Sequence, residues 1–161
     1  MHFNRLLPAA IITLVVASGL SEARADAAGT FATMGGSWAG SGQMRLESGR
    51  TENLRCRANY SARKDGQGLG IALRCASASS KVDLRANLTA SGNRISGNWE
   101  EREFNTGGNA SGSASGNQIS LSINGGIDGS MSVTTNGGRQ SVSITTDNVA
   151  LKGIKMSLSR E

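Results

Sequence analysis

The chain has 161 residues, including 22 glycines, two cysteines and only one histidine, one proline and one tyrosine. Its 17 basic and 12 acidic residues give a net charge of +5. This length supports one hydrophobic core and favours a single domain, and the lone histidine excludes metal sites built from several histidines.

The first 25 residues have the pattern of a secretory signal peptide. Arg5 supplies a positive charge, residues 6–20 form an apolar run, and the sequence Ala-Arg-Ala at 23–25 matches a cleavage site. We predict cleavage after residue 25, with cleavage after residue 27 as the alternative. The apolar run is too short for a comfortable membrane-spanning helix. We therefore expect a periplasmic or secreted protein with no transmembrane segment after cleavage.

Cleavage of this peptide would leave the mature chain without histidine, because His2 is the only one. Ser-His-Asp and Cys-His catalysis and histidine-based metal sites are then excluded. No P-loop or dinucleotide-binding fingerprint is present. We expect no enzymatic activity, no metal site and no cofactor. Without Arg5, Glu22 and Arg24, 15 basic and 11 acidic residues remain, a net charge of +4.

Residues 26–34 are predicted to be a flexible N-terminal segment, and residues 35–161 a single antiparallel β domain. The first predicted strand has Trp38, Met44 and Leu46 on one face. A strand of this kind has a buried and a solvent-facing side.

A hairpin follows at residues 54–76, where two alternating segments flank Asp65-Gly66, a typical hairpin turn. A turn centred on this dipeptide pairs residues whose numbers sum to 131, which places Cys56 opposite Cys75 on the apolar face. Since exported proteins occupy oxidising compartments, we predict a disulfide between the two cysteines.

The same register places Arg57 opposite Arg74 on the polar face, with Arg55 beside them. Like charges in directly opposed positions are unfavourable. Either this is a solvated face with screened charges, or it binds an anion such as an anionic envelope lipid or an acidic glycan. Nucleic acid is not expected as a partner, because the nearby Tyr60 points inward and no base-stacking platform is evident.

Short alternating segments continue to the end of the chain, joined mostly by turns rich in glycine, asparagine and aspartate. They lie at residues 82–88, 95–99, 110–114, 119–123, 127–133, 142–144 and 149–158. A slip in the alternation near Gly153 predicts a β-bulge. The chain is therefore predicted to be all-β, an antiparallel up-and-down meander of about 8–10 strands closing into a small β-barrel, with a β-sandwich as the alternative.

Three aromatic residues on apolar strand faces, Trp38, Tyr60 and Trp99, are candidates for the core or for the mouth of the barrel. The densest acidic group is Glu100-Glu101-Arg102-Glu103. We predict a solvated cluster at the barrel rim in which the arginine pairs with a neighbouring carboxylate.

The tripeptide Gly36-Ser37-Trp38, at the start of the first strand of a one-domain exported meander, resembles the calycin group of small barrels, the lipocalins and avidins. The resemblance implies ligand binding inside the barrel mouth. It also implies that Arg160, near the end of the last strand, is the basic residue that packs on the tryptophan in that group.

Two functions fit these features. The first is an exported periplasmic binding module for an amphiphilic or acidic envelope component, a lipid or glycan. The alternative is a non-enzymatic interaction protein, such as an inhibitor or envelope-stress factor, with a filled barrel. A continuous apolar cavity of several hundred Å3 would favour the first, and a packed interior the second.

Overall fold

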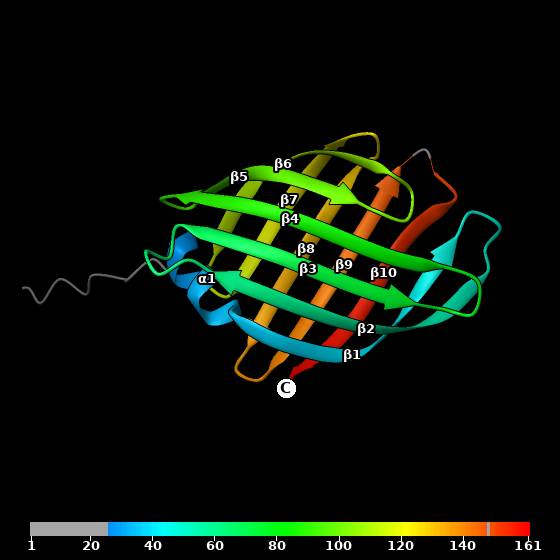
Figure 1. Cartoon of the computed structure of the whole chain (residues 1–161), viewed down its shortest axis with the longest axis horizontal. Helices are drawn as coiled ribbons and strands as arrows, with labels where there is room; N and C mark the ends of the chain where they lie inside the picture. The colour runs from blue at the N-terminus through cyan, green and yellow to red at the C-terminus, as the bar shows by residue number, and fades with distance from the viewer. Residues whose placement is uncertain (1–25, 148) are drawn as a thin grey trace, which may run out of the picture.

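Ten antiparallel strands follow one another around a closed barrel in this computed structural model, which describes residues 26–147 and 149–161 (Figure 1). The signal-peptide prediction lies outside the described residues. The elements are α1 (Ala27–Met34), β1 (Gly36–Leu46), β2 (Thr51–Ala62), β3 (Gly68–Ala76), β4 (Lys81–Ser91), β5 (Arg94–Glu101), β6 (Thr106–Ser115), β7 (Gln118–Gly125), β8 (Asp128–Asn136), β9 (Arg139–Asp147) and β10 (Leu151–Arg160).

The strand order confirms the predicted up-and-down meander and shows that the sandwich alternative is wrong. Each strand pairs with its neighbours in sequence, and β1 also pairs with β10, which closes the sheet on itself. The register between β1 and β10 shifts where Arg45 is opposite Gly153 and Leu46 is opposite Leu151. The irregularity predicted near Gly153 is therefore present.

The hairpin of β2 and β3 has the predicted register. Cys56 is opposite Cys75 and forms the disulfide with it, and Arg57 is opposite Arg74. Both cysteines are buried on the inner face. In the chain-entropy model, a cross-link across this sequence separation of 19 stabilises the fold by about 3 kcal/mol.

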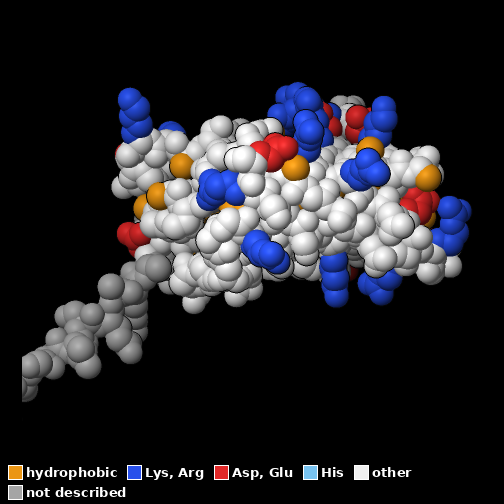
Figure 2. Space-filling view, turned by 90° about the horizontal axis from the view of Figure 1, so that it is seen from below, with side chains coloured by type: hydrophobic (Ala, Val, Ile, Leu, Met, Phe, Trp, Pro, Cys, Tyr) orange, Lys and Arg blue, Asp and Glu red, His pale blue; other side chains and the backbone are white. Residues whose placement is uncertain are grey.

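Alternation along the strands sorts the side chains into an apolar interior and a polar exterior. Strand β2 shows this most regularly, because every second residue from Glu52 to Tyr60 is buried. On the face seen in Figure 2, separate Lys and Arg side chains project from a largely uncharged surface with few apolar side chains.

Glycines on the inner faces of the strands allow neighbouring backbones to approach closely. A Cβ on Gly97 would lie far inside van der Waals contact with the backbone of Asn87 on β4, and one on Gly40 would overlap the backbone of Ser157 on β10. Larger residues would force these strand pairs apart, so the glycines permit the tight curvature of the barrel.

The segment predicted to be flexible, residues 26–34, instead contains α1, which packs into one end of the barrel (Figure 1). Asp26 caps the helix by accepting a hydrogen bond from the Gly29 amide at 2.8 Å. The buried face of the helix consists of Ala27, Thr30, Phe31 and Met34. Eight residues are too few for a clear helical period, but the Asp cap and this spacing of buried residues are the signals that indicate a helix.

Helix α1 contacts the hairpin turns at its end of the barrel, which we call the closed end. The Ala27 amide donates to the carbonyl of Gly92 at 3.1 Å, and the Thr30 hydroxyl donates to the carbonyl of Gly116 at 2.9 Å. These bonds tie the helix to the β4–β5 and β6–β7 turns. Within the described residues, no helix has the length and apolar character needed to cross a membrane.

Candidate functional site

The open end of the barrel, opposite α1, leads into a cavity of about 640 Å3. Its walls are mainly apolar side chains from strands around the barrel, among them Met44, Ile71, Leu84, Leu121, Met131 and Ile154. Ligand pockets typically have volumes of about 300–1,000 Å3 and mostly hydrophobic walls. The size and lining are therefore those of a small-molecule site.

The cavity occupies only part of the interior, because the closed end is filled. Large side chains there are almost fully buried, including Phe31, Met34, Trp38, Leu69, Ile119 and Leu158. A series of hydrogen bonds between buried polar side chains also crosses this part of the barrel. The Tyr60 hydroxyl donates to Gln140 at 2.7 Å, and Gln140 in turn donates to Thr135 at 3.1 Å. The barrel is thus packed near α1 and hollow toward the opposite end.

The three candidate aromatic residues have different positions. Trp38 lies in the packed end, where its Nε1 donates to the carbonyl of Met34 at 2.9 Å. Burial raises the pKa of Tyr60, which therefore stays a neutral hydrogen-bond donor to Gln140 at physiological pH. Only Trp99, among these three, lines the cavity. Trp38 and Tyr60 are thus core residues, and Trp99 belongs to the candidate site.

The indole N–H of Trp99 has no hydrogen-bond partner among the described residues, although the residue is only 7% exposed. Buried polar groups normally have a partner, so an exception requires an explanation. The two residues paired with Trp99 in the sheet, Ala86 and Gly108, are small.

Glu101 lies two residues beyond Trp99 on the same strand, nearer the open end, and it also lines the cavity. It is 7% exposed, and its two carboxylate oxygens accept from the backbone amides of Asp83 at 2.6 Å and Phe104 at 2.7 Å. The acidic group is thus only partly the predicted solvated cluster. Glu100 is exposed and pairs with Arg102 at 2.8 Å as predicted, whereas Glu101 points inward.

The β3–β4 loop, which lies at the rim of the cavity, is held by Glu52. This residue is 9% exposed, and its carboxylate accepts hydrogen bonds from the hydroxyls of Ser77 at 2.6 Å and Ser79 at 2.7 Å. It also forms an ion pair with Arg50 at 3.0 Å. The hydrogen bonds from Ser77 and Ser79 lower the pKa of Glu52. Since Ser80 of the same loop lines the cavity, this carboxylate fixes part of the entrance.

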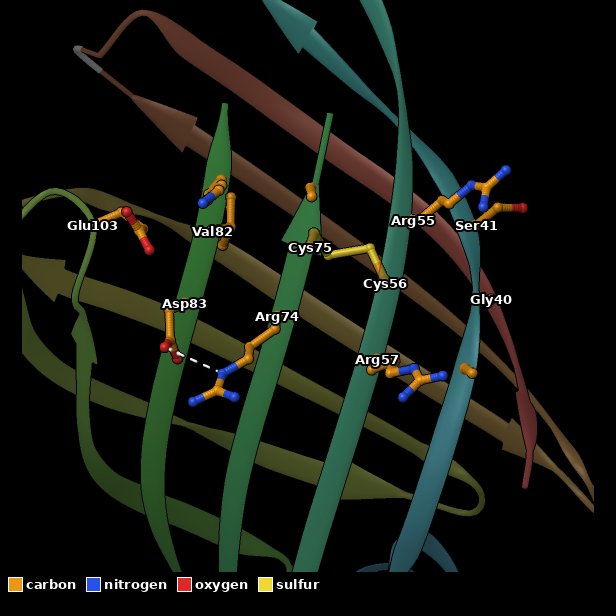
Figure 3. A pocket seen from close by; sticks show the side chains of 13 residues that line it. Gly40, Ser41, Arg55, Cys56, Arg57, Arg74, Cys75, Val82, Asp83 and Glu103 are labelled. Atoms are coloured by element: carbon orange, nitrogen blue, oxygen red, sulfur yellow. Dashed lines mark hydrogen bonds and ion pairs between the residues drawn. A yellow bond between two sulfur atoms is a disulfide. The ribbon is translucent and has the colours of Figure 1, made fainter. Parts of the chain in front are cut away.

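The candidate anion-binding arginines line a shallow depression on the outer face of β1 to β4 (Figure 3). Figure 3 shows that Arg74 extends toward Asp83, whereas Arg57 extends toward β1 and Arg55 lies beside Ser41. The residue paired with Arg57 on β1 is Ala39. The structure therefore places all three on one face, but their side chains do not converge.

Asp83 is the residue of this face that the sequence analysis missed. It accepts from Arg85 at 2.8 Å and from Arg74 at 3.3 Å. Burial opposes its ionisation, but Arg85 and Arg74 together hold the pKa of Asp83 below its ordinary value. Applying the register argument of the first hairpin to the turn at residues 77–80 would have placed Arg74 opposite Asp83, as observed.

No protein-family model matches this chain, and no curated protein is similar to it in sequence. Its fold is similar to that of Rv2717c from M. tuberculosis, with a TM-score of 0.64 and 14% identity over 84% of this chain and 97% of that one. The S-type phycobiliprotein lyase CpeS from Guillardia theta has a TM-score of 0.57 and 8% identity over 81% of this chain and 90% of that one.

Both of these proteins are lipocalin-like or calycin-like ten-stranded barrels. The resemblance noted at Gly36-Ser37-Trp38 is therefore confirmed at the level of the fold. The residue expected to pack on this tryptophan also does so, because the guanidinium carbon of Arg160 lies 4.3 Å from the centre of the Trp38 ring.

Proposed function

We propose that this protein is a binding module that holds an apolar or amphiphilic small molecule inside the barrel. The observation that carries the proposal is the cavity of about 640 Å3, lined mainly by apolar side chains and open at the end opposite α1. Removal of apolar surface from water favours such binding by about 25 cal/mol per Å2. The alternative of an interaction protein with a filled barrel is less well supported, because the interior is not filled.

The polar groups near the opening give the ligand an orientation in this proposal. Lys81, Asn105, Thr106 and Thr146 line the cavity together with Glu101. An amphiphile would place its apolar part among the interior side chains and a polar end at this rim. Lipids and lipid-linked glycans of the cell envelope have this chemistry, and the disulfide Cys56–Cys75 supports an oxidising compartment.

Binding without catalysis is part of the proposal. The one histidine of the chain is His2, in the predicted signal peptide, so the mature protein has no general base of the usual kind. Among the described residues, the charged groups at the cavity are Lys81 and Glu101, and Glu101 already accepts two backbone hydrogen bonds.

Titration with a neutral apolar fluorophore such as N-phenyl-naphthylamine tests the proposal. The test variant is Ala110→Leu, which fills the cavity from β6, and the matched control is Ser111→Leu, which adds the same side chain at the exposed neighbouring position. We expect A110L to weaken binding by at least about tenfold and S111L to leave it unchanged. Equal binding by both variants, or no binding by the parent, would show that the cavity is not a ligand site. If A110L weakens binding and S111L does not, native mass spectrometry of protein purified from its own envelope would identify the natural ligand.

A further inference from the structure

The two tryptophans of the described chain differ in one respect that bears on the ligand. Trp38 Nε1 donates to the carbonyl of Met34, whereas Trp99 Nε1 has no acceptor among the described residues. Both side chains are at least nine-tenths buried. A buried indole N–H usually finds a partner, so the missing acceptor at Trp99 points to a group supplied by the cavity's occupant.

The position of Trp99 makes this possible. It lines the cavity two residues deeper than Glu101, which corresponds to about 7 Å along the strand. The nitrogen itself is covered in the structure, so a hydrogen bond to a ligand would require the indole ring to turn toward the cavity. Ala86, paired with Trp99 on β4, and Ala110 on the cavity wall both have small side chains.

The charges around the cavity restrict the chemistry of the acceptor. Among the described residues, the charged groups that line it are Lys81 and Glu101, both near the open end. A carboxylate or phosphate at the depth of Trp99 would be desolvated with no cation beside it and would have passed the carboxylate of Glu101. Burial of an unpaired anion is strongly unfavourable. A neutral oxygen meets neither obstacle.

We infer that the ligand has an apolar body with a neutral oxygen acceptor, such as a ketone, ester, amide or ether, and that Trp99 Nε1 donates a hydrogen bond to this oxygen. This inference rests on the proposed function, because it names the chemical class that the same cavity takes. An anionic group on the same molecule would remain at the rim, near Lys81.

Three probes of equal chain length test the inference: methyl nonyl ketone, undecane and undecanoate. In isotope-labelled protein, the two indole N–H signals are assigned with the Trp99→Phe variant, and the Trp38 signal serves as the internal control. We expect the ketone to move the Trp99 signal downfield, and undecane and undecanoate to bind without this downfield shift. In Trp99→Phe, affinity for the ketone should fall about fivefold while affinity for undecane changes less than twofold.

The outcomes separate this inference from the proposed function. Binding of ketone and undecane with no downfield shift at Trp99, or with equal ketone affinity in Trp99→Phe and the parent, would overturn the inference and leave the binding function in place. A downfield shift with undecanoate as large as that with the ketone would overturn the restriction to neutral acceptors. If none of the probes binds, the proposed function fails, and this inference fails with it.

Discussion

Arg160 stacks on Trp38 and at the same time holds the helix that covers it. Its guanidinium carbon lies 4.3 Å from the Trp38 ring centre, and its Nη2 donates to the carbonyl of Thr33 at 2.7 Å. A second hydrogen bond runs from Nη1 to the carbonyl of Gly35. One side chain near the C-terminus thus connects β10, the start of β1 and the end of α1.

We expect Arg160→Lys to lower the stability of the fold by about 1 kcal/mol, although it retains the charge. Lysine lacks the planar fork that stacks on a ring and donates to two carbonyls together. Thermal unfolding of the variant, compared with Arg94→Lys at an exposed position of β5, measures this loss. Equal melting temperatures for the parent and both variants would mean that the arginine contributes only a surface charge.

Gly97→Ala should destabilise the barrel by about 1–3 kcal/mol, because its methyl group would overlap the backbone of Asn87 on β4. The control is Gly138→Ala in the β8–β9 turn, where no described atom lies within 4 Å of the added carbon. That change should leave stability unchanged or raise it slightly, since alanine restricts the unfolded chain. Chemical denaturation of both variants tests the contrast, and similar midpoints would contradict the role of Gly97 in close strand packing.

Glu52→Gln should reduce stability at neutral pH and have little effect in acid. The pKa of Glu52 is lower in the folded protein than its ordinary value, so the carboxylate stabilises the fold at pH values above its unfolded pKa. This contribution disappears as pH falls from about 5 toward the folded pKa. Unfolding curves of parent and variant at several pH values should therefore converge below this range.

The matched control for Glu52 is Glu100→Gln, since Glu100 is exposed and forms a surface pair with Arg102. We expect it to change stability little at any pH, because such pairs contribute weakly. A constant difference between parent and Glu52→Gln across the whole pH range would show that shape, not charge, holds the β3–β4 loop.

An anionic partner for the outer arginines remains a prediction, and the structure makes it more specific. Because Arg74 already pairs with Asp83, its removal should affect binding less than removal of Arg57. We expect Arg57→Ser to weaken binding to vesicles of anionic lipid at low salt more than Arg74→Ser does, with the fold unchanged. If the parent and both variants bind to the vesicles equally well, the arginines form only a solvated face.

The register of the first hairpin was predictable because a two-residue turn signal at Asp65-Gly66 fixes every pair along β2 and β3. The inward position of Glu101 follows from the same alternation that places Trp99 inside, so that signal was present in the sequence. The hollow part of the interior was not predictable. It depends on how side chains from strands around the barrel together fill the interior, and no local sequence pattern indicates their total volume.

Helix α1 was missed for a related reason. Its residues have mixed helix propensity, with three alanines beside one glycine and two threonines, and eight residues do not form a stable helix in water. The helix exists because the barrel end offers an apolar surface to Phe31 and Met34, which is a property of the closed fold rather than of the segment.

Closure of the ring by β1 and β10 has a consequence for the order of assembly. Nine of the ten strand pairings join neighbours in sequence, and these hairpins require only short loops to be closed. The tenth joins the first strand to the last, so it forms only after the whole chain has been made. Until then, β1 and an incomplete last hairpin present free edges to other chains, and such edges promote aggregation. A chain that ends before β10 would carry these edges permanently.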